Sequence, residues 1–344
     1  TFIFSLLAFF LSTISYNAGK IVIPLMVLLL TILYSKSLIK MRKNILITCL
    51  MGIILFAFFI FQPNLLGISR FNQTVQGNAD IEKTEVFQKT QNYFLGRVSL
   101  AITQYFWHFD PQFLFISGDK NPRLSSQAAG EFYPADTFLL IIGVVYLIFK
   151  RTREGILILT WALVAPLPSA LFTPAPHAGR TVFMMGSWQI IVAFGLYSIL
   201  LLLRKKIYQI IFFSIIFLVF VSQLLNYLYL YFNEFPKRYG IDWQYGMKQV
   251  VLYVKSHPEY NLIQMTDVRA QPYIFLLYYL QTPLPVFLNT AIYNNSEDKS
   301  SSNVSSFDRY FFGGNLIEST PEKGVLYIVS PSEYDGLKYK SSFD

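Results

Sequence analysis

Long apolar segments fill most of the first two thirds of the chain, and short basic runs separate several of them. Seven segments can be drawn, at about 1–14, 21–34, 45–61, 137–149, 155–172, 182–203 and 207–231. A helix needs roughly 20 residues to cross a bilayer core of about 30 Å. The last two segments meet this length, and aromatic or lysine side chains at the ends of the shorter ones can extend them to the membrane surface. The pattern therefore predicts an α-helical polytopic membrane protein with about seven spans.

The composition favours the same class of protein. Of the 344 residues, 53% are apolar and only 14% are charged, whereas soluble domains average about 25% charged residues. The formal net charge is +8, but residues 232–344 hold ten Lys or Arg against twelve Asp or Glu, a net charge of −2. The positive charge therefore lies among the apolar segments, as it does at the cytoplasmic ends of membrane helices. We expect a lipid bilayer as a partner and no nucleic acid.

The basic runs also predict the orientation in the membrane. They occupy three short connections, at 36–43, 150–153 and 204–206. All three fall on the same side if every apolar segment crosses once, and the positive-inside rule makes that side cytoplasmic. The outer side then receives the turn at 15–20, the loops 62–136 and 173–181, and the tail 232–344. We therefore predict a multi-pass protein of the cytoplasmic (plasma) membrane with an extracytoplasmic C-terminal domain.

Two domains follow from this pattern, a transmembrane region at 1–231 and a tail at 232–344. The outer loop 62–136 has helical spacing of apolar side chains, at Phe87, Phe94, Val98, Ile102, Tyr105 and Phe109. This spacing predicts an amphipathic helix over 81–108, lying in the membrane interface or packed on the outer domain. In the tail we expect helices at 245–255 and 272–280, strands at 262–266 and 324–330, and a mobile loop at 294–308. Such alternation predicts a small α/β domain.

Polar side chains with possible chemistry gather in three outer stretches. In Tyr16-Asn17-Ala18-Gly19-Lys20, the lysine can bind a phosphate and the tyrosine can donate a hydrogen bond, or both can be interfacial anchors. The stretch 109–119 carries Asp110 and Asp119, which can bind a sugar hydroxyl or cap turns. Arg123 follows that stretch and Arg97 precedes it, and both are candidate substrate ligands.

The third stretch is Pro174-Ala175-Pro176-His177-Ala178-Gly179-Arg180, between two long apolar segments. His177 and Arg180 are close enough in sequence to converge on one anion, with the arginine offering a planar fork of donors. Alternatively, Arg180 is an interface anchor and His177 caps a helix. The only cysteine, Cys49, lies in an apolar segment, and the chain has no Gly-rich phosphate loop or His-Glu-x-x-His motif. We predict no cofactor and no metal site, although a role for a divalent metal stays open.

These stretches, taken in order, resemble the polytopic glycosyltransferases of the GT-C superfamily. The resemblance rests on Tyr16 to Lys20 before Pro24, on Phe113-Leu114-Phe115-Ile116-Ser117-Gly118-Asp119, and on Pro168 followed by Pro176 to Arg180. It is nearest to the prokaryotic dolichyl-phosphate-mannose-protein mannosyltransferase-like branch, which Trp243-Gln244-Tyr245-Gly246 also resembles. It covers most of residues 10–285.

The resemblance implies a membrane glycosyltransferase that moves a sugar from a polyprenyl-phosphate donor to a protein, lipid or glycan acceptor on the outer face, with inversion. It implies that the donor phosphate is held by His177, Arg180, Lys20 and Tyr16. The family's catalytic acidic residue lies in the first outer loop, which we expect upstream of Thr1. We therefore expect the chain to be a C-terminal fragment that is inactive by itself.

Other functions fit part of the pattern. An oligosaccharide ligase or polymerase, acting on a diphosphate-linked glycan, would need more outer basic residues than this chain has. A transporter or flippase for a lipid-linked or anionic substrate would place polar groups mid-membrane, where this chain has few beyond Gln189, Gln223 and Asn226. A sensor with a ligand-binding tail would leave the outer-loop motifs without a purpose.

Overall fold

The structure is a computed structural model that describes residues 2–40, 76–268, 271–294, 304–314 and 320–342. The described chain is mostly helical and has one small mixed sheet. It divides into two compact units, Thr1–Lys237 and Arg238–Asp344, whereas the sequence places the boundary at 231/232. The predicted apolar segment at 45–61 lies outside the described residues.

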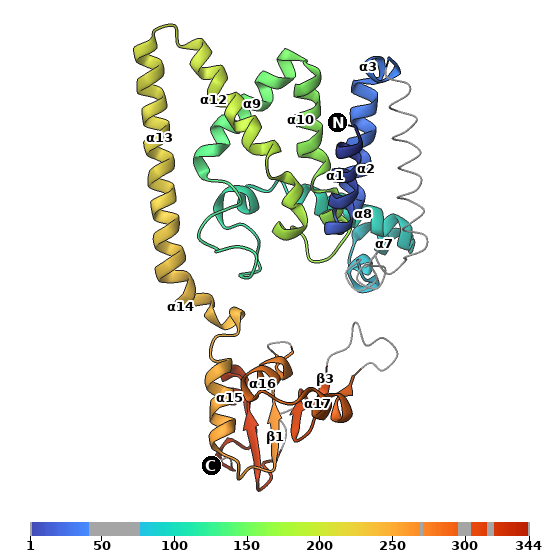
Figure 1. The fold of residues 1–344 in the computed structure, drawn as a ribbon, viewed down its shortest axis with the longest axis vertical. Helices are drawn as coiled ribbons and strands as arrows, with labels where there is room; N and C mark the ends of the chain where they lie inside the picture. Colours follow the sequence, from blue (N-terminus) through green and yellow to red (C-terminus); the bar gives the residue numbers. More distant parts are fainter. Residues whose placement is uncertain (1, 41–75, 269–270, 295–303, 315–319, 343–344) are drawn as a thin grey trace. The chain divides into compact units, whose positions relative to one another are not determined.

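The first unit consists of helices joined by short connections (Figure 1). Its elements are α1 (Phe2–Ser15), α2 (Gly19–Leu33), α3 (Ser35–Ile39), α6 (Asn78–Glu82), α7 (Glu85–Thr90), α8 (Tyr93–Trp107), the π-helical η2 (Gln112–Ile116), α9 (Pro134–Lys150), α10 (Arg153–Val164), α11 (Leu167–Ala170), the 3₁₀ helix η3 (Ala178–Met184), α12 (Ser187–Leu202), α13 (Lys206–Tyr229) and the π-helical η4 (Leu230–Glu234).

Among the described residues, one continuous helix, Lys206–Trp243, is long and apolar enough to cross a membrane. A second candidate exists if η3 and α12, which are bent by 51° relative to each other, form one span. The segment predicted at 155–172 is broken, because Pro166 and Pro168 follow α10 and proline disfavours helix continuation. Residues 2–40, 76–268 and the other described ranges therefore contain fewer helices of sufficient length than the seven spans predicted from the sequence.

Helices α9 and α12 pack closely because each has a glycine at the contact. A Cβ atom on Gly143 would overlap the backbone oxygen of Ile191, and one on Gly195 would overlap the backbone oxygen of Leu139. Small residues at such contacts let helix backbones approach closely, which is typical of membrane helices. The apolar core beside this contact includes Leu147 and Trp188.

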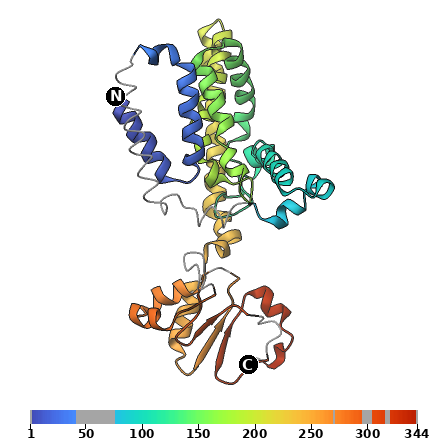
Figure 2. The ribbon, with the colours of Figure 1, turned by 90° about the vertical axis from the view of Figure 1, so that its right-hand side faces the viewer.

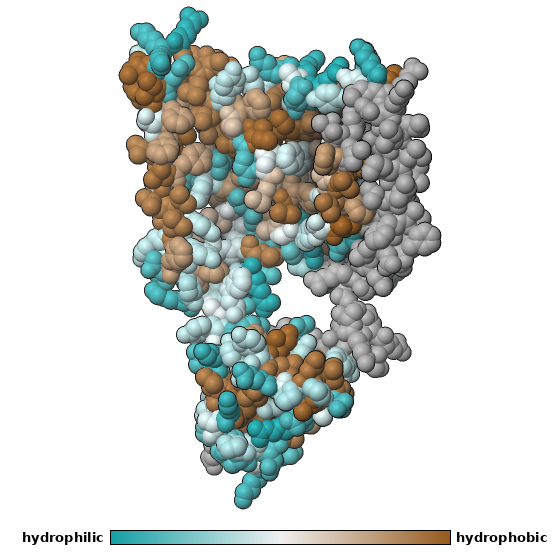
Figure 3. Space-filling model, in the orientation of Figure 1, coloured by the Kyte–Doolittle hydropathy of each residue, from teal (hydrophilic) through white to brown (hydrophobic). Residues whose placement is uncertain are grey.

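The basic connections lie at one end of the first unit. In both ribbon views, α3, the turn between α9 and α10, and the turn between α12 and α13 lie at the same end (Figures 1 and 2). Tyr34, which precedes α3, contacts the first turn of α10, because its hydroxyl donates a 3.0 Å hydrogen bond to Glu154 and the Arg153 guanidinium lies 6.0 Å from its ring. Hydrophobic residues follow α13 along its length (Figure 3).

The predicted amphipathic helix over 81–108 is replaced by α6, α7 and α8. Gln91 ends α7 in the left-handed conformation, and the Asn92 side chain caps α8 by accepting hydrogen bonds from the backbone N–H groups of Phe94 and Leu95. On α8 the apolar residues Phe94, Val98, Ile102 and Phe106 are exposed, so an apolar face is present as predicted, although on a shorter helix.

The second unit is a small α/β fold, seen from the side in Figure 2. Its elements are α14 (Phe235–Tyr239, shared with the first unit), η5 (Gly240–Trp243), α15 (Met247–Ser256), β1 (Leu262–Met265), α16 (Tyr273–Leu280), α17 (Leu284–Thr290), β2 (Ile292–Tyr293), β3 (Val304–Phe307), β4 (Tyr310–Phe312), β5 (Val325–Ile328), α18 (Pro331–Gly336) and η6 (Lys340–Ser342). The strand order is β2-β3-β4-β1-β5. Strand β1 is parallel to β4 and β5, and the other pairs are antiparallel.

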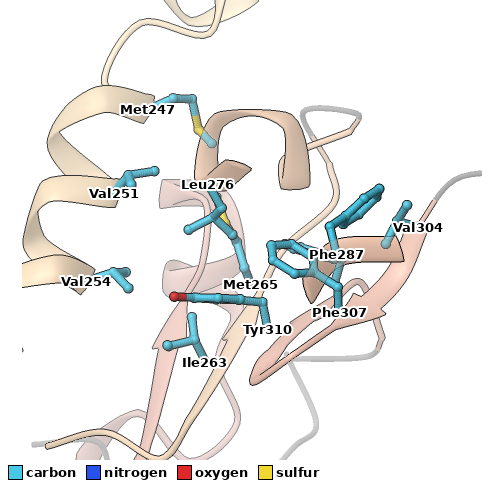
Figure 4. Packing of buried hydrophobic residues seen from close by; sticks show 11 residues of the cluster. Met247, Val251, Val254, Ile263, Met265, Leu276, Phe287, Val304, Phe307 and Tyr310 are labelled. Carbon is cyan, nitrogen blue, oxygen red and sulfur yellow. The ribbon is translucent and has the colours of Figure 1, made fainter. Parts of the chain in front are cut away.

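The core of the second unit lies between this sheet and α15, α16 and α17 (Figure 4). Val251 and Val254 of α15, Ile263 of β1 and Leu276 of α16 are buried in it. The helices and strands predicted in the tail lie within about two residues of α15, β1, α16 and β5. The prediction of a mobile loop at 294–308 is wrong at its end, because Val304–Phe307 forms β3.

Candidate functional site

A pocket of about 620 Å³, here called the first pocket, lies among the α1–α2 turn, the loop before α9, and η3. Its polar lining residues are Tyr16, Arg123, Glu131, Thr181 and Gln189. Its apolar lining residues include Phe113, Leu114, Phe132, Val182, Met184 and Met185. The structure therefore brings two of the candidate residues from the sequence, Tyr16 and Arg123, to one cavity.

The turn between α1 and α2 positions Tyr16. The helices approach closely here, since a Cβ atom on Gly19 would lie 2.6 Å from the backbone oxygen of Ser12. Tyr16 lines the first pocket and is 40% exposed. The Lys20 ammonium donates a 2.6 Å hydrogen bond to Asn17 and is not among the pocket's lining residues. Of this predicted pair, the structure places only the tyrosine in the cavity.

Asp119 links two loops beside the pocket. Its side chain is buried, and its two carboxylate oxygens accept hydrogen bonds of 2.8 Å from the backbone N–H groups of Asn121 and Ala178. Gln127 also donates a side-chain hydrogen bond to the backbone oxygen of Asp119. Asp119 therefore supports the backbone at the start of η3, which agrees with the structural alternative for this residue.

Glu131 is a pocket residue that the sequence reasoning missed. The chain runs along η2 at this point: the backbone N–H of Phe132 donates a 2.8 Å hydrogen bond to Leu114, and a Cβ atom on Gly130 would collide with the same segment. Although solvent reaches the carboxyl group, loss of hydration among the surrounding protein atoms raises the pKa of Glu131 to about 7. The negative charge of Asp119 adds to this increase, while a backbone hydrogen bond from Asp119 opposes it.

His177 and Arg180 do not converge on the pocket. The His177 Nδ1 atom accepts a 3.2 Å hydrogen bond from the backbone N–H of Arg180, so the imidazole caps η3. Arg180 donates a 3.2 Å hydrogen bond from Nη1 to the backbone oxygen of Pro174, and its guanidinium lies 5.5 Å from the ring of Phe172. Burial is the main reason why the pKa of His177 is lowered, and the charge of Arg180 lowers it further.

The remaining candidates lie outside the first pocket. Asp110 is exposed and accepts a 2.9 Å hydrogen bond from the backbone N–H of Gln112, as in a turn. Arg97 is exposed on α8. The structural alternatives from the sequence therefore describe both residues: Asp110 caps a turn and His177 caps a helix.

A second residue missed by the sequence reasoning is His108. Its side chain is fully buried, with Nδ1 at 2.8 Å from the backbone oxygen of Gln104, and Nε2 has no hydrogen-bond partner among the described residues. Burial lowers the pKa of His108 to about 4, and the nearby His177 and Asp119 also affect it, in opposite directions. His177 comes from a distant part of the chain, so sequence spacing gives no sign that it lies near His108.

No protein-family model, curated protein or solved structure matches this chain. In the described parts of the chain, no group of three His, Cys, Asp or Glu residues is arranged to hold a metal ion. The polar side chains that line the first pocket beside its apolar wall are those of Tyr16, Arg123, Glu131, Thr181 and Gln189.

Proposed function

We propose that the intact protein is a membrane glycosyltransferase that moves a sugar from a polyprenyl-phosphate donor to an acceptor outside the cytoplasmic membrane, with inversion. The observation that carries this proposal is the mixed lining of the first pocket, in which Arg123, Tyr16 and Glu131 stand beside an apolar wall. A polyprenyl-phosphate sugar likewise has a polar part and an apolar part, because one phosphodiester joins the sugar to a long hydrocarbon chain.

Arg123 is the cation that we assign to the donor phosphate. It belongs to the pocket lining, and its planar guanidinium suits two phosphate oxygens at once. Tyr16 supplies a hydroxyl that can donate a hydrogen bond to the same group. When the sugar is transferred, the phosphate is the leaving group, and a cation beside it stabilises the growing negative charge. Arg123 takes the role that the sequence assigned to Arg180 and His177, because Arg123 lines the first pocket and the other two do not.

The apolar wall suits the first isoprene units of the donor. Phe113, Leu114 and Met184 form its buried part, and Met185 is 65% exposed. Methionine side chains are flexible and fill irregular apolar contacts. The lipid tail would therefore leave the pocket along this wall, while the phosphate stays beside Arg123.

The placement of the basic connections supports the membrane orientation in this proposal. They lie at one end of the first unit, as the positive-inside rule requires of cytoplasmic loops. We propose that the predicted apolar segments cross the membrane together as a multi-pass bundle and that the first pocket opens at the outer surface. The second unit is then an extracytoplasmic domain.

The test measures donor binding and sugar transfer by the intact protein in lipid nanodiscs, with radiolabelled undecaprenyl-phosphate mannose as the probe. Arg123→Ala should weaken donor binding by roughly tenfold or more, since hydrogen bonds to charged groups contribute about 1.5–3 kcal/mol. Lys120→Ala is the matched control, because Lys120 is an exposed cation of the same loop outside the pocket lining. Equal donor binding by both variants would contradict the proposal, and movement of the lipid across the bilayer without sugar transfer would favour a flippase.

A further inference from the structure

A second pocket, of about 630 Å³, lies among α6, α7, α8 and the loop at 173–175. It shares no lining residue with the first pocket. The two are nevertheless neighbours along one loop, because Thr173, Pro174 and Ala175 line the second pocket while Ala178 and Gly179 line the first. A single short segment therefore contributes to both cavities.

One face of α8 forms a wall of the second pocket. Ser99, Thr103 and Trp107 all line it, and their spacing of four residues places them one above another on the helix. Trp107 is 43% exposed. This wall presents two hydroxyl groups followed by the face or edge of an indole ring. It differs from the neighbouring stripe of α8, where Phe94, Val98 and Ile102 are exposed and apolar.

The other wall carries charges of both signs. Asp80, Lys83 and Glu85 line the pocket, which gives this wall one positive and two negative groups. The Lys89 ammonium also lies 3.8 Å from the Glu85 carboxylate, so the charges at this wall balance and an anion such as a phosphate gains no net attraction here. A neutral ligand with several hydroxyl groups suits this wall, since carboxylates accept hydrogen bonds from hydroxyls and an ammonium donates to them.

The base of the pocket is held by buried amides. Gln104 lines the pocket and is 3% exposed, and its side-chain oxygen accepts a 2.8 Å hydrogen bond from Gln76. Gln76 also donates a 3.0 Å hydrogen bond to the backbone oxygen of Ala170. These two hydrogen bonds link α8 to α11 through Gln76, whose own side-chain oxygen has no hydrogen-bond partner among the described residues. The α8 wall is thus fixed relative to α11, which follows the broken end of α10.

We propose that the second pocket binds a neutral carbohydrate, which is the acceptor of the transferred sugar. An aromatic ring beside hydroxyls and carboxylates suits a sugar, because the ring covers its C–H face while the polar groups bind its hydroxyls. A peptide is favoured less, since the lining offers no exposed strand edge for its backbone. The proposal that this pocket binds a glycan does not depend on the proposed function, whereas its role as the acceptor site does.

The experiment is saturation-transfer NMR on the intact protein in nanodiscs, with methyl α-D-mannopyranoside and methyl β-D-glucopyranoside as probes and a tripeptide as the competing ligand class. The wild-type protein should transfer saturation to the C–H protons of at least one glycoside. Trp107→Ala should weaken this binding by about tenfold, which corresponds to loss of an aromatic contact. Trp243→Ala, which removes an exposed indole of the second unit, should leave it unchanged.

Thr103→Val provides a second variant of nearly the same shape, and it should also weaken glycoside binding. Binding that is absent in the wild type, or equal in Trp107→Ala, Thr103→Val and Trp243→Ala, overturns the proposal, as does binding of the tripeptide alone. Arg123→Ala should leave glycoside binding intact, because Arg123 lines the other pocket. If donor transfer fails while Trp107-dependent glycoside binding persists, the proposed transferase function is wrong and the glycan site remains.

Discussion

One carboxylate oxygen of Asp119 accepts a 2.8 Å hydrogen bond from the backbone N–H of Ala178, 59 positions away in the chain. The other oxygen binds the N–H of Asn121. This buried carboxylate therefore joins the loop that carries Arg123 to the turn that begins η3. Both segments line the first pocket, so the pocket's shape depends on the contact.

Asp119→Asn should lower thermal stability and donor binding together. Asparagine keeps one side-chain oxygen, so one of the two backbone N–H groups loses its acceptor, at a cost of about 1–3 kcal/mol for a buried group. A thermal-unfolding measurement in nanodiscs checks the first effect, and donor titration checks the second. Asp110→Asn is the control, because Asp110 makes a similar turn contact on the exposed surface. Equal effects of the two variants would show that the Asp119–Ala178 contact has no special role.

Gly195→Val should separate α9 from α12. The new side chain would collide with the backbone oxygen of Leu139, and overpacking of a helix contact costs about 1–3 kcal/mol or more. The measurement is the unfolding temperature of the purified protein. Gly77→Ala serves for comparison, since no atom of the described residues, apart from its chain neighbours, lies within 4 Å of a Cβ atom at that position. An unchanged unfolding temperature for Gly195→Val would mean that the two helices do not meet at this glycine.

Donor binding should weaken as the pH rises through about 7. The pKa of Glu131 is raised to about 7, so the group is largely neutral below that pH and negatively charged above it. A phosphodiester keeps its charge over this range, and a negative Glu131 would repel it by about 1 kcal/mol, a factor of about five in affinity. Glu131→Gln should remove this dependence and retain the higher affinity at pH 8. A wild-type affinity that is constant between about pH 6 and pH 8 would contradict the prediction.

His108 should make the fold less stable in acid. Its pKa is about 4 in the folded chain against 6.5 for an ordinary histidine, so the unfolded chain binds more protons between these values. The free energy of unfolding is therefore unaffected above about pH 6.5 and falls as the pH drops towards 4, by about 3 kcal/mol at most. Unfolding curves at several pH values measure this. His108→Gln should flatten the dependence, and an unchanged dependence in that variant would contradict this origin of the acid sensitivity.

The sequence predicts helices and strands better than it predicts which parts of the chain contact one another. Apolar spacing located α9, α12, α13 and the main elements of the second unit, because periodicity is a local signal. It missed β3, since Val304–Phe307 lies in a Ser- and Asn-rich stretch and becomes a strand by pairing with β4. It also missed the break after α10, although Pro166 and Pro168 were visible.

For the candidate site, too, the sequence identified some residues but not the contacts that they make. Sequence motifs led to Tyr16 and Arg123, which do line one pocket. They could not show that Arg180 is held by Pro174 and Phe172, because that depends on how the loop folds. Burial raises the pKa of Glu131, with a further contribution from the charge of Asp119, and no residue pattern near Glu131 indicates this.

The most direct measurement is photo-crosslinking of the intact protein with a polyprenyl-phosphate sugar that carries a photoreactive group on its first isoprene unit. Mass spectrometry of the crosslinked peptides locates the donor. The proposed function predicts crosslinks to the apolar wall of the first pocket, at Phe132, Met184 or Met185, and their loss in Arg123→Ala. Crosslinks that concentrate on the second pocket or along α13, and that persist in Arg123→Ala, would contradict the account.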